Sequence, residues 1–289
     1  MGPPALHGSF DLPSIAIDRA VVRALEEDLG SGDPTTEACI EADAQAIAHA
    51  VARAPLVVCG GPVFARTFVL LDESLVVQTH VAEGTSVGIG ARLWTVRGRA
   101  RPILMGERVA LNFAQRLSGI ASTARAYVDA VPAGTKARIT DTRKTTPGLR
   151  ALERYAVRIG GARNHRNDLG AAVLIKDNHR VACRGLGAAI ERVRAAAPHT
   201  SRIECEVDSL EQLDEALAAS ADIILLDNMP TSLIELAVRR TGGRALLEVS
   251  GGVTLDRVPE IARAGVDAIS VGALTHSVLA ADIGLDFEP

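Results

Sequence analysis

The second half of the chain repeats one pattern that restricts its possible folds. A short apolar run ends in a polar residue or a glycine, and most of these runs are followed by a segment with helical periodicity. The six runs are ARITDT, AVLIKD, RIECEVD, IILLD, ALLEVS and AISVG. The helical segments include LGAAIERVRAAA, SLEQLDEALAA, TSLIELAVRR and TLDRVPEIARA. Alternating strands and helices predict a parallel sheet that is covered on both faces or closed into a barrel.

Either arrangement gathers the polar residues that end the strands at one edge of the sheet. In a barrel the active site lies at the carboxyl ends of the strands, and phosphate often binds to the loops after the last two. An open doubly wound sheet would also bind ligands at its strand ends, but no GxGxxG sequence follows a first strand here. The barrel is therefore the favoured prediction.

The first half of the chain is organised differently. The stretch SIAIDRAVVRALEEDL has apolar residues at helical spacing and stops before Gly30. Between about Asp43 and Arg101, the runs AIAHAVARA, LVVCGG, LVVQTHV and RLWTVRG predict short strands of an antiparallel or mixed sheet. From Pro102 to Val131 we predict a long helical stretch with one break near Gly119, which would be a hinge between two domains.

Composition excludes several classes of protein. The 289 residues are 47% apolar but only 3% aromatic, and 31 Lys+Arg against 35 Asp+Glu give a net charge of −4. A basic surface with stacking aromatics is therefore not expected, and nucleic acid is excluded as a partner.

The four cysteines form no CxxC pair, so neither a zinc site nor a redox dithiol is indicated. No signal peptide or apolar run of ~18 residues is evident, so we expect a soluble cytoplasmic protein without a membrane segment.

Cationic residues cluster near the predicted strand ends. The stretch DTRKTTPGLR brings three cations close together in an acidic chain, and the segments NHR and LIKDNH add more. These residues are Arg143, Lys144, Arg150, His165, Arg166 and Lys176. Several such groups at one mouth indicate a ligand with several negative charges. Solvated surface charges are the alternative, less favoured because the residues flank apolar strands. Arg150 has no assigned role and could bind the ligand or cap the loop.

Acidic and glycine-rich strand ends complete the predicted site. Glu206 and Asp227 each end a strand, and their carboxylates suit Mg²⁺, although helix caps or ion pairs with lysines are equally compatible with the sequence. Ser250, Gly251 and Gly252, together with Gly272 and Ala273, follow the last two strands. Glycine lets backbone N–H groups approach a phosphate closely, so these turns predict a phosphate site.

Taken in order, these motifs resemble the quinolinate phosphoribosyltransferase family. The stretches that carry the resemblance are DTRKTTPGLR, NHR, LIKDNH, ECEVDSLEQLDEAL, ILLDNM, EVSGGV and ISVGALTH. It extends to EDLGSGDPTT near the start of the chain and to GERVALNFAQRLSGIAS before the predicted barrel. The resemblance covers nearly the whole chain.

The resemblance implies the fold of a type II phosphoribosyltransferase. An N-terminal open α/β sandwich would comprise residues 1–116, with a C-terminal tail, residues 277–289, packed back on it. Residues 117–276 would form an incomplete, TIM-like α/β barrel of about seven strands. The resemblance also implies a homodimer with shared active sites, in which Arg108 serves the partner's site, and it leaves open a higher assembly of dimers.

The implied reaction joins quinolinate to phosphoribosyl pyrophosphate and gives nicotinate mononucleotide, pyrophosphate and carbon dioxide. Arg143, His165, Arg166 and the partner's Arg108 would bind the two carboxylates of quinolinate. Lys144, Lys176, Glu206 and Asp227 would form the catalytic machinery, the two acids with Mg²⁺. The turns at Ser250–Gly252 and Gly272–Ala273 would hold the 5′-phosphate.

Two other functions remain compatible with the sequence. A paralogue associated with molybdenum uptake would share the fold and handle a different base. An anion-binding or sensory barrel would keep the phosphate site without turnover. Pyrophosphate release in the presence of quinolinate distinguishes the three, and a purely structural role is the least favoured because polar strand ends would then be desolvated without benefit.

Overall fold

The computed structural model describes residues 12–289 and divides them into two compact units. The first contains the chain up to Gly119, residues 147–156 and residues 280–289; the second contains residues 120–146 and 157–279. The boundaries predicted from the sequence lie three residues earlier, at 116 and 277, and leave residues 147–156 in the second unit.

The first unit is built on an antiparallel sheet with strand order β12-β1-β5-β3. Its strands are β1 (Gln45–Ala52), β3 (Val76–Thr79), β5 (Arg92–Arg99) and β12 (Ile283–Phe287). A separate two-stranded ribbon joins β2 (Leu56–Val57) to β4 (Ser86–Val87). Because β12 pairs with β1, the C-terminal strand belongs to this sheet.

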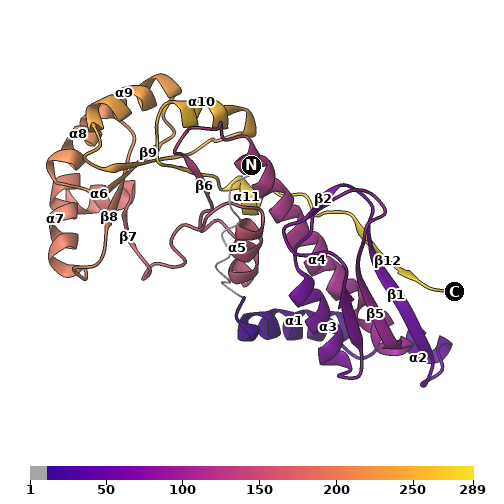
Figure 1. Ribbon diagram of the computed structural model, residues 1–289. Helices are drawn as coiled ribbons and strands as arrows, with labels where there is room; N and C mark the ends of the chain where they lie inside the picture. Colours follow the sequence, from indigo (N-terminus) through magenta and orange to yellow (C-terminus); the bar gives the residue numbers. More distant parts are fainter. Residues whose placement is uncertain (1–11) are drawn as a thin grey trace. The chain divides into compact units, whose positions relative to one another are not determined.

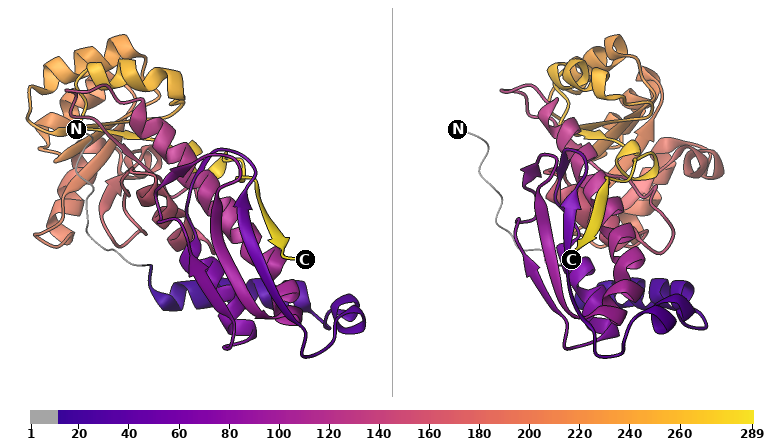
Figure 2. Two further views of the ribbon diagram at one scale, coloured as in Figure 1. Left: turned by 45° about the vertical axis from the view of Figure 1, so that its right-hand side comes forward. Right: turned by 90° about the vertical axis from the view of Figure 1, so that its right-hand side faces the viewer.

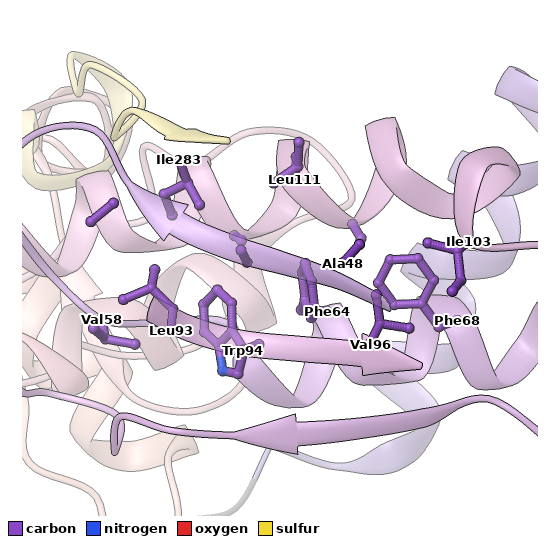
Figure 3. Close-up of a cluster of buried hydrophobic side chains, with 14 of the residues drawn as sticks. Ala48, Val58, Phe64, Phe68, Leu93, Trp94, Val96, Ile103, Leu111 and Ile283 are labelled. Carbon is purple, nitrogen blue, oxygen red and sulfur yellow. The ribbon is translucent and has the colours of Figure 1, made fainter. Parts of the chain in front are cut away.

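Among the described residues, the helices of the first unit are α1 (Ser14–Leu29), α2 (Pro34–Cys39), α3 (Gly61–Leu71), the start of α4 (Ala100–Asp129) and most of α5 (Arg150–Ile159). Figure 2 shows α3 and α4 on one face of the four-stranded sheet. The core lies between these helices and the sheet. There the ring of Trp94 stacks on that of Phe64, with ring centroids 4.9 Å apart (Figure 3). Few aromatics are needed, because Ala, Val, Leu and Ile fill most of the remaining space.

One helix of this half of the chain was not predicted and one prediction was wrong. Helix α3 lies between two of the runs predicted as strands; Glu83 stabilises its start by accepting hydrogen bonds from the N–H groups of Gly60 and Gly61. Helix α4 continues through Gly119 without the expected break. A glycine in a helix costs only about 1 kcal/mol relative to alanine, and burial of Ser118 and Ile120 on either side offsets that cost.

The second unit is a parallel sheet with strand order β6-β11-β10-β9-β8-β7. All six predicted strands are confirmed: β6 (Arg138–Thr140), β7 (Val173–Ile175), β8 (Ile203–Val207), β9 (Ile223–Asp227), β10 (Leu246–Ser250) and β11 (Ala268–Ser270). Within this unit the first strand, β6, pairs with the last, β11, as in a barrel, but β6 and β7 do not pair. A single bridge between Thr140 and Arg163 extends the β6 edge, so the barrel is incomplete.

Helices connect successive strands of this sheet from β7 to β11 and cover its outer face (Figure 1). They are α6 (Asp177–Cys183), α7 (Leu186–Ala196), α8 (Leu210–Ala218), α9 (Thr231–Thr241) and α10 (Val258–Arg263), which is preceded by a 3₁₀ turn at Leu255–Arg257. The short helix α11 (Ala273–His276) follows β11. Ser209 begins α8 as a cap, because its hydroxyl accepts from the N–H of Gln212. Among the described residues, no helix has the length and apolar character needed to cross a membrane. All four cysteines are free thiols.

Candidate active site

Strand periodicity determines which side chains face the interior of the barrel. Successive residues of a strand point to opposite sides of the sheet. In β8 the residues Ile203, Cys205 and Val207 are buried among apolar groups, whereas Glu204 and Glu206 lie on the other side. Strands β7, β9 and β10 place the pairs Leu174 and Lys176, Leu225 and Asp227, and Glu248 and Ser250 in the same way.

These interior side chains line a cavity of about 610 Å³ at the carboxyl ends of the strands. Ten residues predicted from sequence lie in its wall: Arg143, Lys144, His165, Arg166, Lys176, Glu206, Asp227, Ser250, Gly251 and Gly252. Gly272 and Ala273 do not line it, and Arg108 is an exposed residue of α4 that belongs to the first unit. The structure therefore brings together cationic, acidic and glycine-rich segments that are far apart in the sequence.

Opposite charges meet inside this cavity. The Nζ atom of Lys176 lies 3.6 Å from Oε2 of Glu206. Burial raises the pKa of Glu206, and the nearby Asp227 acts in the same direction against Lys176. Burial lowers the pKa of Arg166, and repulsion from the positive charge of Arg143 lowers it further. Both like-charged pairs would be stabilised by a ligand of opposite charge.

Glu206 and Asp227 fit a divalent cation on these grounds. They are half-buried oxygen donors on neighbouring strands, they face the same cavity, and their mutual repulsion would be relieved by a bound cation. Asp227 also accepts a hydrogen bond of 2.8 Å from the side-chain amide of Asn228, which fixes one of its oxygens.

The turn after β10 leaves no room for a side chain. Gly251 has φ +87°, and a Cβ atom there would lie 2.3 Å from Oδ1 and 2.9 Å from the backbone N of Asn228. Asn228 is itself held by the hydrogen bond from its N–H to the carbonyl of Ser250. Glycine is therefore required at position 251 for the turns after β9 and β10 to approach each other.

Gly272 contributes to the site indirectly through Lys144. The Thr275 hydroxyl donates to the Lys144 carbonyl at 2.8 Å, and the Lys144 N–H donates to Oγ1 of Thr142 at 3.1 Å. A Cβ on Gly272 would lie 3.2 Å from Cδ of Lys144. The loop after β11 thus packs against the lysine without lining the cavity itself.

At the floor of the cavity, the predicted site residue His165 contacts two buried acids, Glu204 and Glu248, that were not predicted from the sequence. The Nε2 atom of His165 is 3.3 Å from Oε2 of Glu204 and 3.3 Å from Oε1 of Glu248. The Ser270 hydroxyl donates to Glu248 as well. Period-two alternation could have found both acids, because Glu204 and Glu248 stand two residues before Glu206 and Ser250.

The groups of this cluster influence one another's pKa values. Burial lowers the pKa of His165, but hydrogen bonds to Glu204 and Glu248 outweigh that effect and raise it to about 10. Burial raises the pKa of Glu204. The backbone N–H of Arg166 donates to Nδ1 of His165 at 2.7 Å, which requires a lone pair on Nδ1. A second ring proton would occupy Nδ1 and break this hydrogen bond. We therefore infer that Nε2 carries the single ring proton, and that the additional proton implied by the raised pKa belongs to the cluster and resides on the carboxyl of Glu204, whose pKa burial raises.

Comparison with known proteins gives consistent matches over most of the chain. Residues 33–118 match the family described as quinolinate phosphoribosyl transferase, N-terminal domain, and residues 120–286 match its C-terminal domain. The nicotinate-nucleotide pyrophosphorylase [carboxylating] of Mycobacterium leprae is 48% identical over 91% of this chain and 94% of its own length. The human protein of the same name is 41% identical, covering 81% of this chain and 80% of its own length.

Solved structures match the fold as well. The crystal structure of nicotinate-nucleotide pyrophosphorylase from Ehrlichia chaffeensis has a TM-score of 0.90 at 42% identity, covering 94% of this chain and 98% of that one. Sequence and fold comparisons therefore agree.

Proposed function

The chain belongs to the quinolinate phosphoribosyltransferase family and catalyses phosphoribosyl transfer to quinolinate with decarboxylation, and we propose that the reaction takes place in the cavity at the ends of β6–β11. The enzyme is a carboxylating nicotinate-nucleotide pyrophosphorylase of NAD biosynthesis. One observation carries the placement: cationic, acidic and glycine-rich segments line a single cavity.

The cationic side of the cavity suits quinolinate, which carries two adjacent carboxylates. Arg143 and Arg166 can each form paired hydrogen bonds with a carboxylate. Burial and the charge of Arg143 both lower the pKa of Arg166, and the bound dianion would relieve the repulsion between the two arginines. His165 lines the same part of the cavity. These side chains would hold the ring nitrogen of quinolinate toward the sugar carbon.

Transfer forms a bond from the ring nitrogen to C1 of the ribose and breaks the bond from C1 to a pyrophosphate oxygen. Positive charge develops on the sugar and negative charge on the leaving group, so positioned charges lower the barrier. The carboxylate next to the ring nitrogen then leaves as CO₂. Its bonding electrons pass into the cationic ring, and a proton takes the vacated position.

Lys144 and Lys176 line the cavity and would stabilise the negative charge on the departing pyrophosphate. Glu206 and Asp227 would hold Mg²⁺, which when bound neutralises charge on the phosphate oxygens. The turn at Ser250–Gly252 would bind the 5′-phosphate through its backbone N–H groups. The loop at Gly272 and Ala273 would support it through the contact with Lys144.

The proposal includes a homodimer with shared sites. Arg108 is an exposed residue of the first unit, and in the proposed dimer it would contact quinolinate in the cavity of the partner subunit. A cytoplasmic location likewise stays a prediction of the sequence.

The deciding experiment measures pyrophosphate release from phosphoribosyl pyrophosphate with quinolinate or nicotinate, with Mg²⁺ or with excess EDTA. We expect release with quinolinate and Mg²⁺ only. Mixing inactive Arg108→Ala with inactive Lys176→Ala protein should restore part of the activity if sites are shared between subunits. Release with nicotinate alone, or phosphate binding without turnover, would contradict the proposed function.

A further inference from the structure

The turns after β9 and β10 are joined by an arginine that does not line the cavity. Arg257 ends the 3₁₀ turn between β10 and α10, and its side chain is half-buried. Its Nη1 donates to the carbonyl of Gly252 at 3.2 Å, and its Nη2 donates to the carbonyl of Met229 at 3.4 Å. One guanidinium group therefore spans the turn after β10 and the turn after β9.

Neither helix α10 nor an acidic partner explains the position of this charge. Arg257 directly precedes the first residue of α10, where the helix dipole disfavours a cation. Within residues 12–289, its side chain donates only to the two carbonyls and forms no salt bridge. The fork of N–H donors suits two acceptors that come from different segments. The contacts with the two turns are therefore what holds the side chain in place.

The bond to Gly252 also orients the peptide group that follows this residue. The C=O and N–H of a trans peptide point in opposite directions, so a carbonyl turned toward Arg257 directs the N–H of Val253 away from it. The Tyr127 hydroxyl donates to the next carbonyl, that of Val253, at 3.5 Å. In the described part of the chain, the N–H groups of Gly251, Gly252 and Val253 donate to no acceptor. These donors are thus available to the oxygens of a phosphate.

The same two turns also meet directly. The N–H of Asn228 donates to the Ser250 carbonyl at 2.9 Å, and the side-chain amide of Asn228 donates to Asp227 at 2.8 Å. Arg257 adds a second connection, which starts outside both turns. The distance between Asp227 and the glycine turn therefore depends on both connections.

Building on the proposed function, we propose that Arg257 is a positioning residue for phosphoribosyl pyrophosphate. Its two donors hold the turns at the separation at which Asp227 and the turn at Ser250–Gly252 act on one ligand. The fork matters more than the positive charge, because the side chain does not line the cavity. Quinolinate, which is assigned to Arg143 and Arg166, does not depend on these turns.

Steady-state kinetics of two Arg257 variants test this role. Arg257→Ala should raise the KM for phosphoribosyl pyrophosphate about 5- to 10-fold, the net effect of one lost hydrogen bond, and leave the KM for quinolinate unchanged. Arg257→Lys keeps the charge but loses the fork, so it should not restore the wild-type KM. Arg263→Ala, which removes an exposed arginine of α10, is the matched control and should change neither constant.

An unchanged KM for phosphoribosyl pyrophosphate in Arg257→Ala, an equal rise for both substrates, or full restoration by Arg257→Lys would overturn the proposal. A lower Tm with both KM values unchanged would show a purely structural role and overturn it as well. Failure of the proposed function would look different, because wild-type protein would then release no pyrophosphate with quinolinate.

A second measurement needs no turnover. Calorimetric titration with phosphoribosyl pyrophosphate and Mg²⁺, without quinolinate, gives the Kd for Gly251→Ala, Arg257→Ala and the double variant. Because Gly251→Ala already moves the turns apart, adding Arg257→Ala should weaken binding by a smaller factor than it does in the wild type. Factors that multiply fully would show that the two residues act independently and would contradict the proposal. Arg257→Lys takes the place of an alanine variant that does not fold.

Discussion

Replacement of Gly251 by alanine should weaken binding of phosphoribosyl pyrophosphate while leaving binding of quinolinate largely unchanged. The residue has φ +87°, and the new Cβ would lie within 3.0 Å of three atoms of Asn228, at 2.3, 2.5 and 2.9 Å. One of these atoms is the backbone N that bonds to the Ser250 carbonyl. The side chain of Asn228 also bonds to Asp227. The substitution therefore moves the turn after β9 away from the turn after β10.

The cost of this change has two parts. A left-handed conformation costs a non-glycine residue about 1–2 kcal/mol, and insertion of a methyl group into a packed contact costs about 1–3 kcal/mol more. Gly243→Ala is the matched control, because its φ is +79° and nothing lies within 4 Å of its Cβ position. We expect the control to lower the free energy of unfolding by about 1–2 kcal/mol and Gly251→Ala by about 2–5 kcal/mol.

Steady-state kinetics provide the functional assay, and thermal unfolding the measure of stability. Loss of one hydrogen bond to a charged phosphate is worth about 1.5–3 kcal/mol, so Gly251→Ala should raise the KM for phosphoribosyl pyrophosphate about 10- to 100-fold. The KM for quinolinate should change far less, and Gly243→Ala should change neither. A wild-type KM for phosphoribosyl pyrophosphate in Gly251→Ala, or an equal rise in Gly243→Ala, would refute the reasoning.

Three further predictions concern charge and packing. Lys176→Ala should lower kcat at least ~10²-fold, the scale of a lost electrostatic contact in a closed site; Lys136→Ala, which removes only a surface lysine, should keep full activity in the same assay. The hydrogen bond from Arg99 holds the pKa of Asp72 well below its usual range, so this carboxylate stabilises the fold above the unfolded-state pKa of about 4; the difference in Tm between wild type and Asp72→Asn should persist at neutral pH and shrink as the pH falls below 4. Phe64→Ala should lower the free energy of unfolding by about 3–5 kcal/mol, measured by urea denaturation; a loss below 1 kcal/mol would show that its stacking on Trp94 contributes little.

Local patterns predicted much of the fold because they act over a few residues. All six barrel strands, the first helix and the four strand-forming runs of the first unit lie where apolar periodicity indicated. Helix α3 was missed because its start depends on Glu83, more than twenty residues away. The expected break at Gly119 was wrong because burial on both sides decides whether a glycine interrupts a helix.

The sequence by itself determined which residues end the strands and therefore reach one edge of the sheet. Residue type and a two-residue period suffice for that, because both are local properties. Only the tertiary structure decided what each side chain contacts there. The attachment of His165 to Glu204 and Glu248, and the close approach of Gly251 to Asn228, join segments that are distant in the chain. Such contacts depend on the curvature and register of the whole sheet, which no short stretch of sequence specifies.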